Sequence, residues 1–488
     1  MTLKHQISPN YIKQLHNVLP PQEVEQFVDV CFKPLKKSIR FVLHKWDVDE
    51  LKNFLQGQGW HFADPGFLQD SRFPQDIFYV DRDDTTIPLG NTFVHKAGYI
   101  YIQEVAAALA VRALDLKKWA RVLDMSAAPW WKATQIADYL LYLDDQNPWF
   151  VVANDVAKPR IKKMAYNVNR IGAYNIGLTA FNWFAFGKNL PEFFDYVLLD
   201  APCSGEGTGY KSATALKFWK QEEINKIKGT QFQLLVSALK TLKVWWELVY
   251  STCTLNPYEN EMNVANILEQ YWDFIKLQDI QRIDVDKGIS HIWEQQILDP
   301  VQAQKLRRLR PHRQGSWWFF IARFQKVGSN TREYAHFENK FVSKNPFRLD
   351  FSQSLQSRVK DWLKQNYWIQ INQWVFFVAS KELIYITSSQ ILQIKDHINF
   401  EKIGIPIIKR TRWYVRPTHH LGNILWAQAT KNVVQIDAQQ AQDYALGKNL
   451  PNDFNQSFDT DYIILNWQGR WFSVAKVIGD ILKNKMIS

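Results

Sequence analysis

Short apolar runs alternate with amphipathic stretches of helical length between residues 101 and 325. Five of these runs are predicted to be buried strands, at residues 122–125, 150–155, 195–200, 247–251 and 318–324. Three of the stretches between them are predicted to be helices, at residues 133–143, 159–171 and 221–242. The helix at 159–171 begins with Pro159 and is followed by Gly172, a typical start and stop. This alternation predicts a doubly wound, mostly parallel α/β sheet.

The segments on either side of this region have a different pattern. Residues 1–100 mix helical patterns at 23–32 and 48–57 with an alternating, strand-like pattern at 38–45. Asp47 is placed to cap the second of these helices. Residues 326–345 are polar and are predicted to form a linker. A basic, aromatic region follows, in which residues 408–416 interleave charges with rings; such a segment can bind phosphates and stack bases, or form a strand with one solvated face.

Composition narrows the choice of partner and compartment. The 488-residue chain carries a formal net charge of +11, which fits a polyanionic partner but also an ordinary basic protein. Its three cysteines, Cys31, Cys203 and Cys253, are too few for a disulfide framework and lack zinc-site spacing, so we expect a reduced, cytoplasmic setting. No apolar run reaches the length of a membrane span, and the N-terminus lacks the apolar core of a signal peptide.

Two of the cysteines each follow a predicted strand. Cys203 lies in Asp-Ala-Pro-Cys-Ser-Gly-Glu-Gly at 200–207, and Cys253 lies in Ser-Thr-Cys-Thr-Leu-Asn-Pro at 251–257. Ligands of open α/β sheets bind at the carboxyl ends of the strands. A thiolate is a strong nucleophile once its pKa is lowered, although a lone buried cysteine is more often inert packing. Two thiols at one edge indicate covalent chemistry in which one attacks and the other assists.

These two segments resemble the paired Pro-Cys and Thr-Cys motifs of RNA cytosine-C5 methyltransferases of the Nol/Nop/Sun family. Residues 124–132, Asp-Met-Ser-Ala-Ala-Pro-Trp-Trp-Lys, resemble that family's S-adenosylmethionine loop. The resemblance implies a Rossmann-like S-adenosylmethionine-dependent methyltransferase domain with a small N-terminal α+β domain and a C-terminal PUA-like α+β region. The implied units are an N-terminal RNA-binding region (1–100), the methyltransferase domain (101–325), a linker (326–345), a small α+β domain (346–402) and a PUA-like RNA-binding domain (403–488).

The resemblance also implies a reaction and a partner. The expected activity is S-adenosylmethionine-dependent methylation of cytosine C5 in 16S rRNA, within the 30S subunit, through a covalent cysteine–C6 adduct. Neither a metal, a membrane nor DNA is expected to take part. Two alternatives stay open: a tRNA cytosine-C5 methyltransferase, and a catalytically impaired RNA-binding or ribosome-assembly protein that keeps the fold.

Residue roles follow the family motifs. Cys253 matches the nucleophile and Cys203 the cysteine that aids release. Asp200 matches the acid that contacts the cytosine edge and the donor site. Lys211 matches a lysine that approaches the active site, although a solvated surface lysine is an equally good interpretation.

The donor site is expected to combine one loop with several separate side chains. Asp155 is placed to accept the two ribose hydroxyls, Asn182 stands beside the adenine where the family usually has Asp, and Asp200 completes the site. The remaining residues are Ser126, Ala127, Ala128, Pro129, Trp130, Trp131, Lys132 and Arg160. Glu104 matches a family segment, or is a helix-start acid favoured by the helix dipole.

Tryptophan repeatedly replaces the family's glycine. It does so at Trp130, Trp131, Trp183, Trp245, Trp246, Trp317 and Trp318. Glycine tolerates positive φ and lets the backbone approach a ligand, and a larger residue with positive φ costs roughly 1–3 kcal/mol. The pairs Trp130-Trp131 and Trp245-Trp246 fall in predicted turns, which argues against simple core packing. We therefore expect S-adenosylmethionine to bind weakly or not at all, unless the rings turn into the core.

Overall fold

The fold was analysed in a computed structural model. The structure describes residues 7–486 apart from 32, 128–130, 146, 207–215, 218, 330–348, 371–373, 379–381, 411–413, 425–428 and 455. No helix within these described ranges is both long and apolar enough to cross a membrane.

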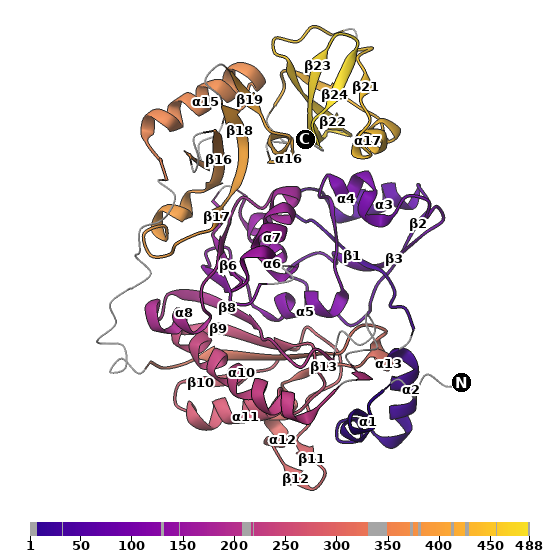
Figure 1. Cartoon of the computed structure of the whole chain (residues 1–488), viewed down its shortest axis with the longest axis vertical. Helices are drawn as coiled ribbons and strands as arrows, with labels where there is room; N and C mark the ends of the chain where they lie inside the picture. Colours follow the sequence, from indigo (N-terminus) through magenta and orange to yellow (C-terminus); the bar gives the residue numbers. More distant parts are fainter. Residues whose placement is uncertain are drawn as a thin grey trace.

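A nine-stranded sheet forms the centre of the molecule (Figure 1). Its parallel strands, in spatial order, are β9 (Leu242–Thr252), β8 (Phe194–Asp200), β5 (Val122–Asp124), β6 (Val151–Asn154) and β7 (Ile176–Thr179). Antiparallel strands extend both edges, namely β14 (Phe319–Lys326), β10 (Ile275–Gln278), β13 (Arg307–Leu309) and β17 (Lys402–Ile403). The predicted Rossmann-like α/β fold is confirmed.

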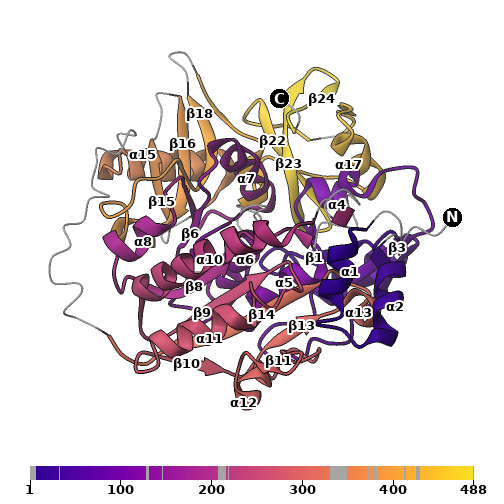
Figure 2. The same ribbon diagram turned by 60° about the horizontal axis from the view of Figure 1, so that its bottom comes forward.

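Helices cover both faces of this sheet (Figure 2). One face carries α5 (Val105–Ala113), α6 (Trp131–Leu143) and α7 (Lys158–Ile171); the other carries α8 (Phe184–Asn189), α10 (Gln221–Thr241) and α11 (Glu261–Gln270). Successive strand residues point to opposite faces, so Val122 packs with the first set and Leu123 with the second. Both are fully buried, which explains why the strands are continuous apolar runs.

Two predicted elements differ from the structure. The predicted strand 38–45 ends at Phe41, and all four residues of β1 (Ser38–Phe41) are buried instead of alternating, because the strand is central in its sheet and α6 lies against it. Trp245 and Trp246 lie inside β9 and not in a turn. Pairing with β8 shifts register there, and Trp245 has a φ of 74° and a side chain that is 68% exposed. A bulge accommodates this Trp pair.

The N-terminal part holds a four-stranded antiparallel sheet in the order β2 (Trp60–Ala63), β3 (Ile77–Arg82), β1 and β4 (Ile100–Ile102). Its helices are α3 (Val48–Gln56), η2 (Leu89–Asn91) and α4 (Phe93–Lys96). Asp47 caps α3 as predicted, accepting from the N–H groups of Asp49 and Glu50. In contrast, α1 (Pro9–Leu15) and α2 (Pro21–Cys31) pack against Trp219, Leu255 and Trp318 of the central unit.

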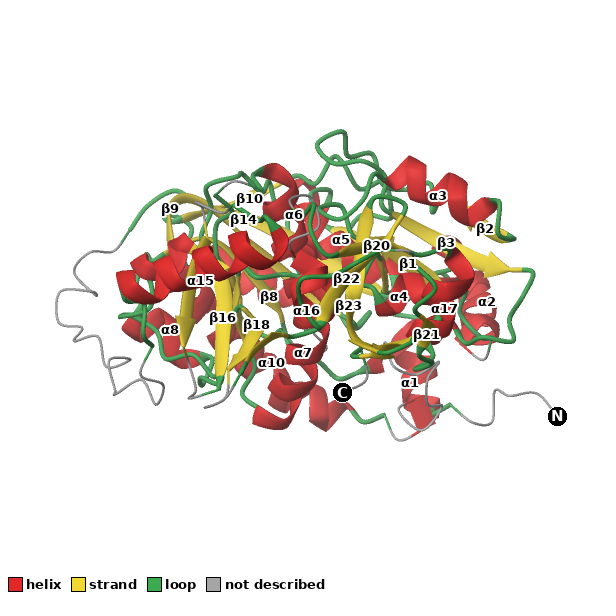
Figure 3. Ribbon diagram, turned by 90° about the horizontal axis from the view of Figure 1, so that it is seen from above, coloured by secondary structure: helices red, strands yellow, loops and turns green. Residues whose placement is uncertain are grey.

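Two smaller sheets lie side by side beyond the central unit, with α16 (His420–Ile424) between them (Figures 1 and 3). The first contains β15 (Trp374–Val378), β16 (Leu383–Ser388), β18 (Ile405–Arg410) and β19 (Val415–Pro417), with α15 (Gln353–Tyr367) and η4 (Ser389–Gln393). The second contains β20 (Val433–Gln435), β22 (Tyr462–Trp467), β23 (Arg470–Ile478), β24 (Ile481–Asn484) and β21 (Leu450–Pro451), with α17 (Ala438–Ala445). The remaining elements are β11 (His291–Ile292), β12 (Gln295–Gln296), α12 (Pro300–Ala303) and α13 (Pro311–Gln314).

An aromatic cluster joins the last sheet to the N-terminal part. Trp467 is 1% exposed, and its ring lies 4.9 Å from Trp46, 4.8 Å from Phe54 and 4.6 Å from Phe93, measured between centroids. The first small sheet instead docks on the edge of the central sheet, where β17 pairs with β7. This cluster therefore joins segments that are up to 421 residues apart in sequence, from Trp46 to Trp467.

A buried ion pair fixes the N-terminal sheet against α6. Arg40 and Asp138 are both fully buried and in contact. Asp138 also accepts from the backbone N–H groups of Leu43 (3.2 Å) and His44 (3.1 Å) and interacts with the His44 ring (2.7 Å). Burial alone would raise the pKa of Asp138, but Arg40 and His44 hold it below its ordinary value. The carboxylate is thus a charged anchor between two units.

Removing Arg40 should be strongly destabilising. Arg40→Met leaves the Asp138 charge buried without its main counter-ion, at an expected cost of about 3–5 kcal/mol in chemical denaturation. The double variant Arg40→Met/Asp138→Leu should recover much of that loss, and the exposed Arg358→Met should change stability by less than about 0.5 kcal/mol. A single variant as stable as this control would contradict the anchoring role.

Candidate active site

The two motif cysteines lie together at the carboxyl edge of the central sheet. Strands β8 and β9 are parallel neighbours that pair Asp200 with Ser251, and the Ala201 N–H continues the pairing to the Ser251 carbonyl (2.9 Å). The loops that follow bring Cys203 Sγ to 3.0 Å from Cys253 Sγ. The hydrogen bond with the Cys253 thiol, together with burial, raises the pKa of Cys203 well above its ordinary value. Cys203 therefore keeps its proton at neutral pH.

Asp200 links the cysteine loops to the predicted donor loop. Its Oδ1 accepts from the Ser251 hydroxyl (2.7 Å), and its Oδ2 forms an ion pair with Lys132 Nζ (2.7 Å). Lys132 stands in the first turn of α6, and its ammonium lies 5.4 Å from the centre of the Phe319 ring. The structure thus joins two residues that the sequence placed in separate motifs.

A buried polar network ties the two cysteine loops to each other. Glu206 is 2% exposed and accepts from Trp219 Nε1 (2.8 Å) and from the Thr254 hydroxyl (2.7 Å). The Ser204 hydroxyl donates to Thr254 Oγ1 (3.2 Å). Burial raises the pKa of Glu206 to about 7, and the neighbouring Glu259 adds to the shift. Each cysteine is therefore flanked by a residue of one continuous network.

Glu259 and Asn260 hold the same loops from the other side. Glu259 Oε2 accepts from the Ser204 N–H (2.9 Å) and from Gln231 (2.8 Å). The Asn260 amide donates to the Thr254 carbonyl (2.8 Å) and accepts from the Thr252 hydroxyl (2.6 Å). Because these groups are buried and hydrogen-bonded, the thiols are held on a rigid support.

The predicted donor residues gather around Asn154, which is fully buried at the end of β6. Its amide donates to the carbonyls of Met125 (3.2 Å) and Phe181 (3.1 Å), and its Oδ1 accepts from the Thr179 hydroxyl (2.9 Å) and the Phe181 N–H (2.8 Å). The Ala127 N–H reaches the Asn154 carbonyl (2.7 Å). One side chain therefore connects the loops after β5, β6 and β7.

The acids at these strand ends differ in their surroundings. Asp155 Oδ1 accepts from the Ala157 N–H (2.8 Å), and Arg160 Nη1 lies 3.6 Å from its Oδ2. Asp124 is fully buried, and neither of its carboxylate oxygens, nor the buried Ser126 hydroxyl, has a hydrogen-bond partner among the described residues. Burial raises the pKa of Asp124 to about 7; Lys132 opposes the shift, and other nearby carboxylates add to it.

Trp131 is partly buried against the core. It occupies the first turn of α6 with helical backbone, so this position does not need the positive φ of glycine. Its partly buried ring lies 5.9 Å from the ring of Trp317. Glu104 fixes the facing segment: it caps α5 through the Ala106 N–H (2.7 Å) and accepts from the Ser316 hydroxyl (2.6 Å). Trp318, which follows Trp317 in the sequence, is buried in the core.

Of the predicted site residues not yet placed, one is exposed and four lie outside the described residues. Asn182 is exposed, and its Oδ1 accepts from the Phe184 N–H (3.1 Å). Ala128, Pro129, Trp130 and Lys211 lie outside the described residues. Asn154, Asp124, Glu206 and Glu259 had no predicted role. Asp124 and Asn154 each stand at the end of an apolar run, Glu206 lies within one cysteine motif, and Glu259 lies two residues after the other; these positions were the available signal.

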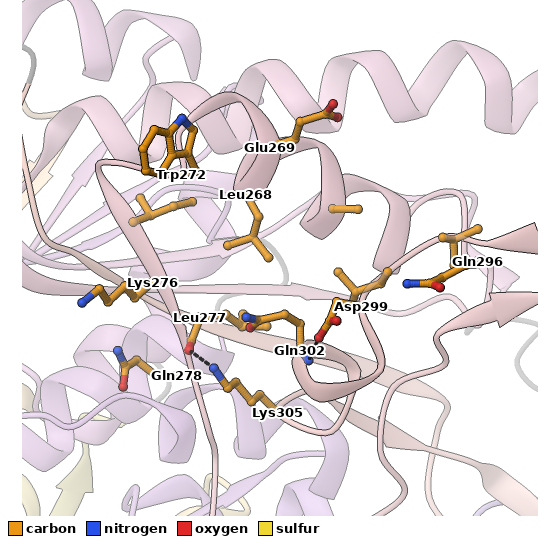
Figure 4. Close-up of a pocket in the computed structure, with 14 residues that line it drawn as sticks. Leu268, Glu269, Trp272, Lys276, Leu277, Gln278, Gln296, Asp299, Gln302 and Lys305 are labelled. Atoms are coloured by element: carbon orange, nitrogen blue, oxygen red, sulfur yellow. Dashed lines mark hydrogen bonds between the residues drawn. The ribbon is translucent and has the colours of Figure 1, made fainter.

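A hollow lies away from this edge. It has a volume of about 860 Å³ between α11, β10 and α12, with Leu268, Trp272 and Lys305 in its wall (Figure 4). Lys305 Nζ donates to the Leu277 carbonyl (3.2 Å). None of the residues around it belongs to the cysteine loops or the donor loops, so it takes no part in the site.

Comparison with known proteins agrees with this geometry. Residues 111–325 match the family described as 16S rRNA methyltransferase RsmB/F. Ribosomal RNA small subunit methyltransferase F of Aeromonas salmonicida is 30% identical over 98% of this chain and 95% of its own length, and that of Erwinia tasmaniensis is 31% identical over the same shares. A methyltransferase homologue from Pyrococcus horikoshii superimposes with a TM-score of 0.55 at 27% identity, over 66% of this chain and 100% of its own. NSun6 from the same organism, with SFG, gives 0.55 at 20% identity, over 67% and 100%.

The fold and its strand-end site define the central unit as a Rossmann-like methyltransferase. The chain belongs to the ribosomal RNA small subunit methyltransferase F family. It is therefore a methyltransferase of small-subunit rRNA.

Burial of Glu206 has a consequence for stability that pH should reveal. Its pKa is raised from 4.5 to about 7 on folding, so the folded protein binds more protons than the unfolded chain between these values. Stability should therefore fall as pH rises from about 4.5 to 7 and then level off, a loss of about 3 kcal/mol. Glu206→Gln resembles the protonated form and should lack this loss.

The measurement is the difference in Tm between the two proteins across pH 4.5–8. The variant should gain on the natural chain as pH rises through this window. Glu294→Gln is the matched control, because Glu294 is exposed in the turn between β11 and β12. Its Tm should change with pH in the same way as that of the unaltered chain. Parallel curves for Glu206→Gln and the natural chain would show that Glu206 is not buried as a proton-binding group.

Proposed function

We propose that this protein methylates cytosine C5 in 16S rRNA, within the small ribosomal subunit, using S-adenosylmethionine and a covalent cysteine–C6 adduct. The observation that carries the proposal is the pair of thiols 3.0 Å apart at the ends of neighbouring parallel strands. Inert packing does not require two thiols at a ligand-binding edge, each in a loop held by buried hydrogen bonds. Family membership supports the rRNA of the small subunit over tRNA.

The residues present suit the donor. Asp124 and Ser126 offer buried polar atoms with no partner among the described residues, and a carboxylate in such a place suits the donor's ammonium group. Asp155 is placed for the ribose hydroxyls, with Ala127, Lys132 and Asp200 along the path between them. The archaeal NSun6 neighbour was solved with SFG, an S-adenosylmethionine analogue. When bound, S-adenosylmethionine supplies an electrophilic methyl group to C5.

The remaining chemistry belongs to the protein's own side chains. The Cys253 thiolate attacks C6, forming an S–C6 bond and moving the C5–C6 electron pair to C5. After methylation, C5 loses its proton to solvent, that electron pair restores the C5–C6 double bond, and the S–C6 bond breaks. The Cys203 thiol, 3.0 Å away and protonated, stabilises the departing Cys253 thiolate by a hydrogen bond. Asp200, held by Lys132 and Ser251, orients the cytosine edge.

The target base must leave its stack to reach this edge. The C-terminal units are proposed to add RNA affinity to the catalytic unit. On the described part of residues 408–416, Lys409 pairs with Glu382 (3.4 Å) and Arg416 lies 5.8 Å from the Tyr414 ring centre. The second candidate function, an impaired RNA-binding protein, is favoured by one observation only: tryptophan in place of both donor-loop glycines.

The two thiols should fail in different ways. Cys253→Ala should abolish methyl transfer to purified 30S subunits, because it removes the nucleophile. Cys203→Ala should instead accumulate a protein–RNA adduct that survives a denaturing gel, because release loses its assistance. Cys31→Ala, in a buried cluster away from the loops, is the control and should retain transfer. An adduct with Cys253→Ala would reverse the roles.

Donor binding should improve when the loop glycines are restored. Trp130→Gly/Trp131→Gly should raise affinity for S-adenosylmethionine at least tenfold, about 1.4 kcal/mol, by calorimetry. Because the Trp131 ring packs on Trp317, Trp130→Gly should supply the larger share. Trp245→Gly restores a glycine at the opposite end of β9 and should leave affinity unchanged. Micromolar binding by the natural chain would refute the expected impairment.

A further inference from the structure

Helix α7 carries an unusual charge pattern. Its 14 residues, from Lys158 to Ile171, include five cations and no acid, although acids ordinarily favour the first turn of a helix. The helix begins four residues after β6, and Asp155 of the predicted donor site lies in that connection. Its N-terminal turn therefore stands at the same sheet edge as the thiols.

One side of α7 is fixed by the units around it. Ile161, Met164 and Val168 are buried against the core. At the C-terminal end, buried Arg170 donates to the Ile100 carbonyl (3.1 Å) of the N-terminal sheet. On another side, Lys402 Nζ donates to the Ala165 carbonyl (3.0 Å). The helix thus contacts three parts of the molecule: the core of the central sheet, the N-terminal sheet and the segment that contains Lys402 (Figure 1).

The opposite side of α7 is solvent-exposed and basic. The side chains of Lys158 and Arg160 are 69% and 61% exposed, and Lys162 and Lys163 are exposed as well. Lys158 pairs with Glu401 at 2.9 Å. Lys162 and Lys163 have no ion-pair partner within the described residues. Tyr166, one turn further along the line of Lys158 and Lys162, is 57% exposed.

We propose that this face of α7 is a track for the phosphate backbone of the RNA substrate, leading from the catalytic edge toward the C-terminal units. The inference rests on the proposed function in taking RNA as the substrate. Lys158, Lys162 and Tyr166 are spaced four residues apart, so they extend over about 12 Å along the helix axis. Cations in such a row neutralise successive phosphates, and an exposed tyrosine ring can stack an unpaired base.

The far end of the track meets further positive charge. Helix α7 contacts β18 and α16 of the C-terminal units. Strand β18 ends at Lys409, which pairs with Glu382 at 3.4 Å, and at Arg410; Arg416 lies opposite Lys409 in the adjacent strand β19. A strand of RNA that leaves the catalytic edge along α7 would therefore reach these cations next. The positive charge along this route is complementary to RNA. An acidic protein could also bind these cations, but the start of the route at the catalytic edge favours the RNA substrate.

The experiment compares a lysine pair on the exposed face of α7 with a lysine pair at the amino end of the sheet. Lys162→Gln/Lys163→Gln neutralises the track, and Lys117→Gln/Lys118→Gln removes the same charge from an exposed pair just before β5, at the amino end. Binding to a 16S rRNA transcript is measured by filter retention at several salt concentrations. The α7 variant should bind about tenfold more weakly, with a salt slope smaller by about 1.5–2. The control pair should change affinity less than twofold.

Each outcome decides the proposal. Equal losses in the two variants would show general attraction by net charge and overturn the track, and so would unchanged binding by the α7 variant. Tyr166→Ala should weaken binding several-fold without altering the salt slope, which separates stacking from charge. Unchanged Tm values check that every variant is folded. The binding measurement does not depend on methyl transfer. A chain that binds RNA through α7 but transfers no methyl group would therefore contradict the proposed function and leave the α7 proposal intact.

Discussion

Parallel pairing of β8 with β9 is the constraint on which the proposed chemistry of the two cysteines depends. The two cysteine motifs are 50 residues apart in sequence, and only the pairing of Asp200 with Ser251 brings them to one place. A slip of one residue in this register would turn the alternate side chains of β9 to the opposite faces of the sheet. Buried Leu248 and Tyr250 on one face, and Val249 on the other, make such a slip costly. The core therefore specifies the distance between the thiols.

Buried polar groups then convert this rough placement into a defined geometry. Hydrogen bonds of Glu206, Glu259 and Asn260 determine the path of both cysteine loops, and Asn154 does the same for the donor loops. Each group is costly to bury alone and is stabilising when fully partnered. The Lys132–Asp200 pair is the contact between the two halves of the site. In the proposed mechanism, catalysis and donor binding therefore share this one ion pair, and a change at either residue is expected to affect both.

Much of the fold could be predicted, because its signals are local. Continuous apolar runs give strands buried on both faces, and Pro159 and Gly172 mark the two ends of α7. The meeting of Cys203 and Cys253 followed from motif position and strand direction. By contrast, the contact of Trp131 with Trp317 joins residues that are 186 positions apart, and the bulge at Trp245 depends on how β9 meets β8. The hydrogen bonds of Asn154 depend on the loops after β5, β6 and β7 together, so they cannot be predicted from any one segment.

The contact of Trp467 with the N-terminal part has a consequence for synthesis. Trp46, Phe54 and Phe93 leave the ribosome early, but the ring that completes their cluster, Trp467, is made 374 residues after Phe93. Until then these aromatic groups lack their final cover, so the nascent chain carries an adhesive apolar surface for most of its translation. A protein that acts on the ribosome's own RNA thus depends, for this cluster, on two segments that are far apart in sequence and must fold together.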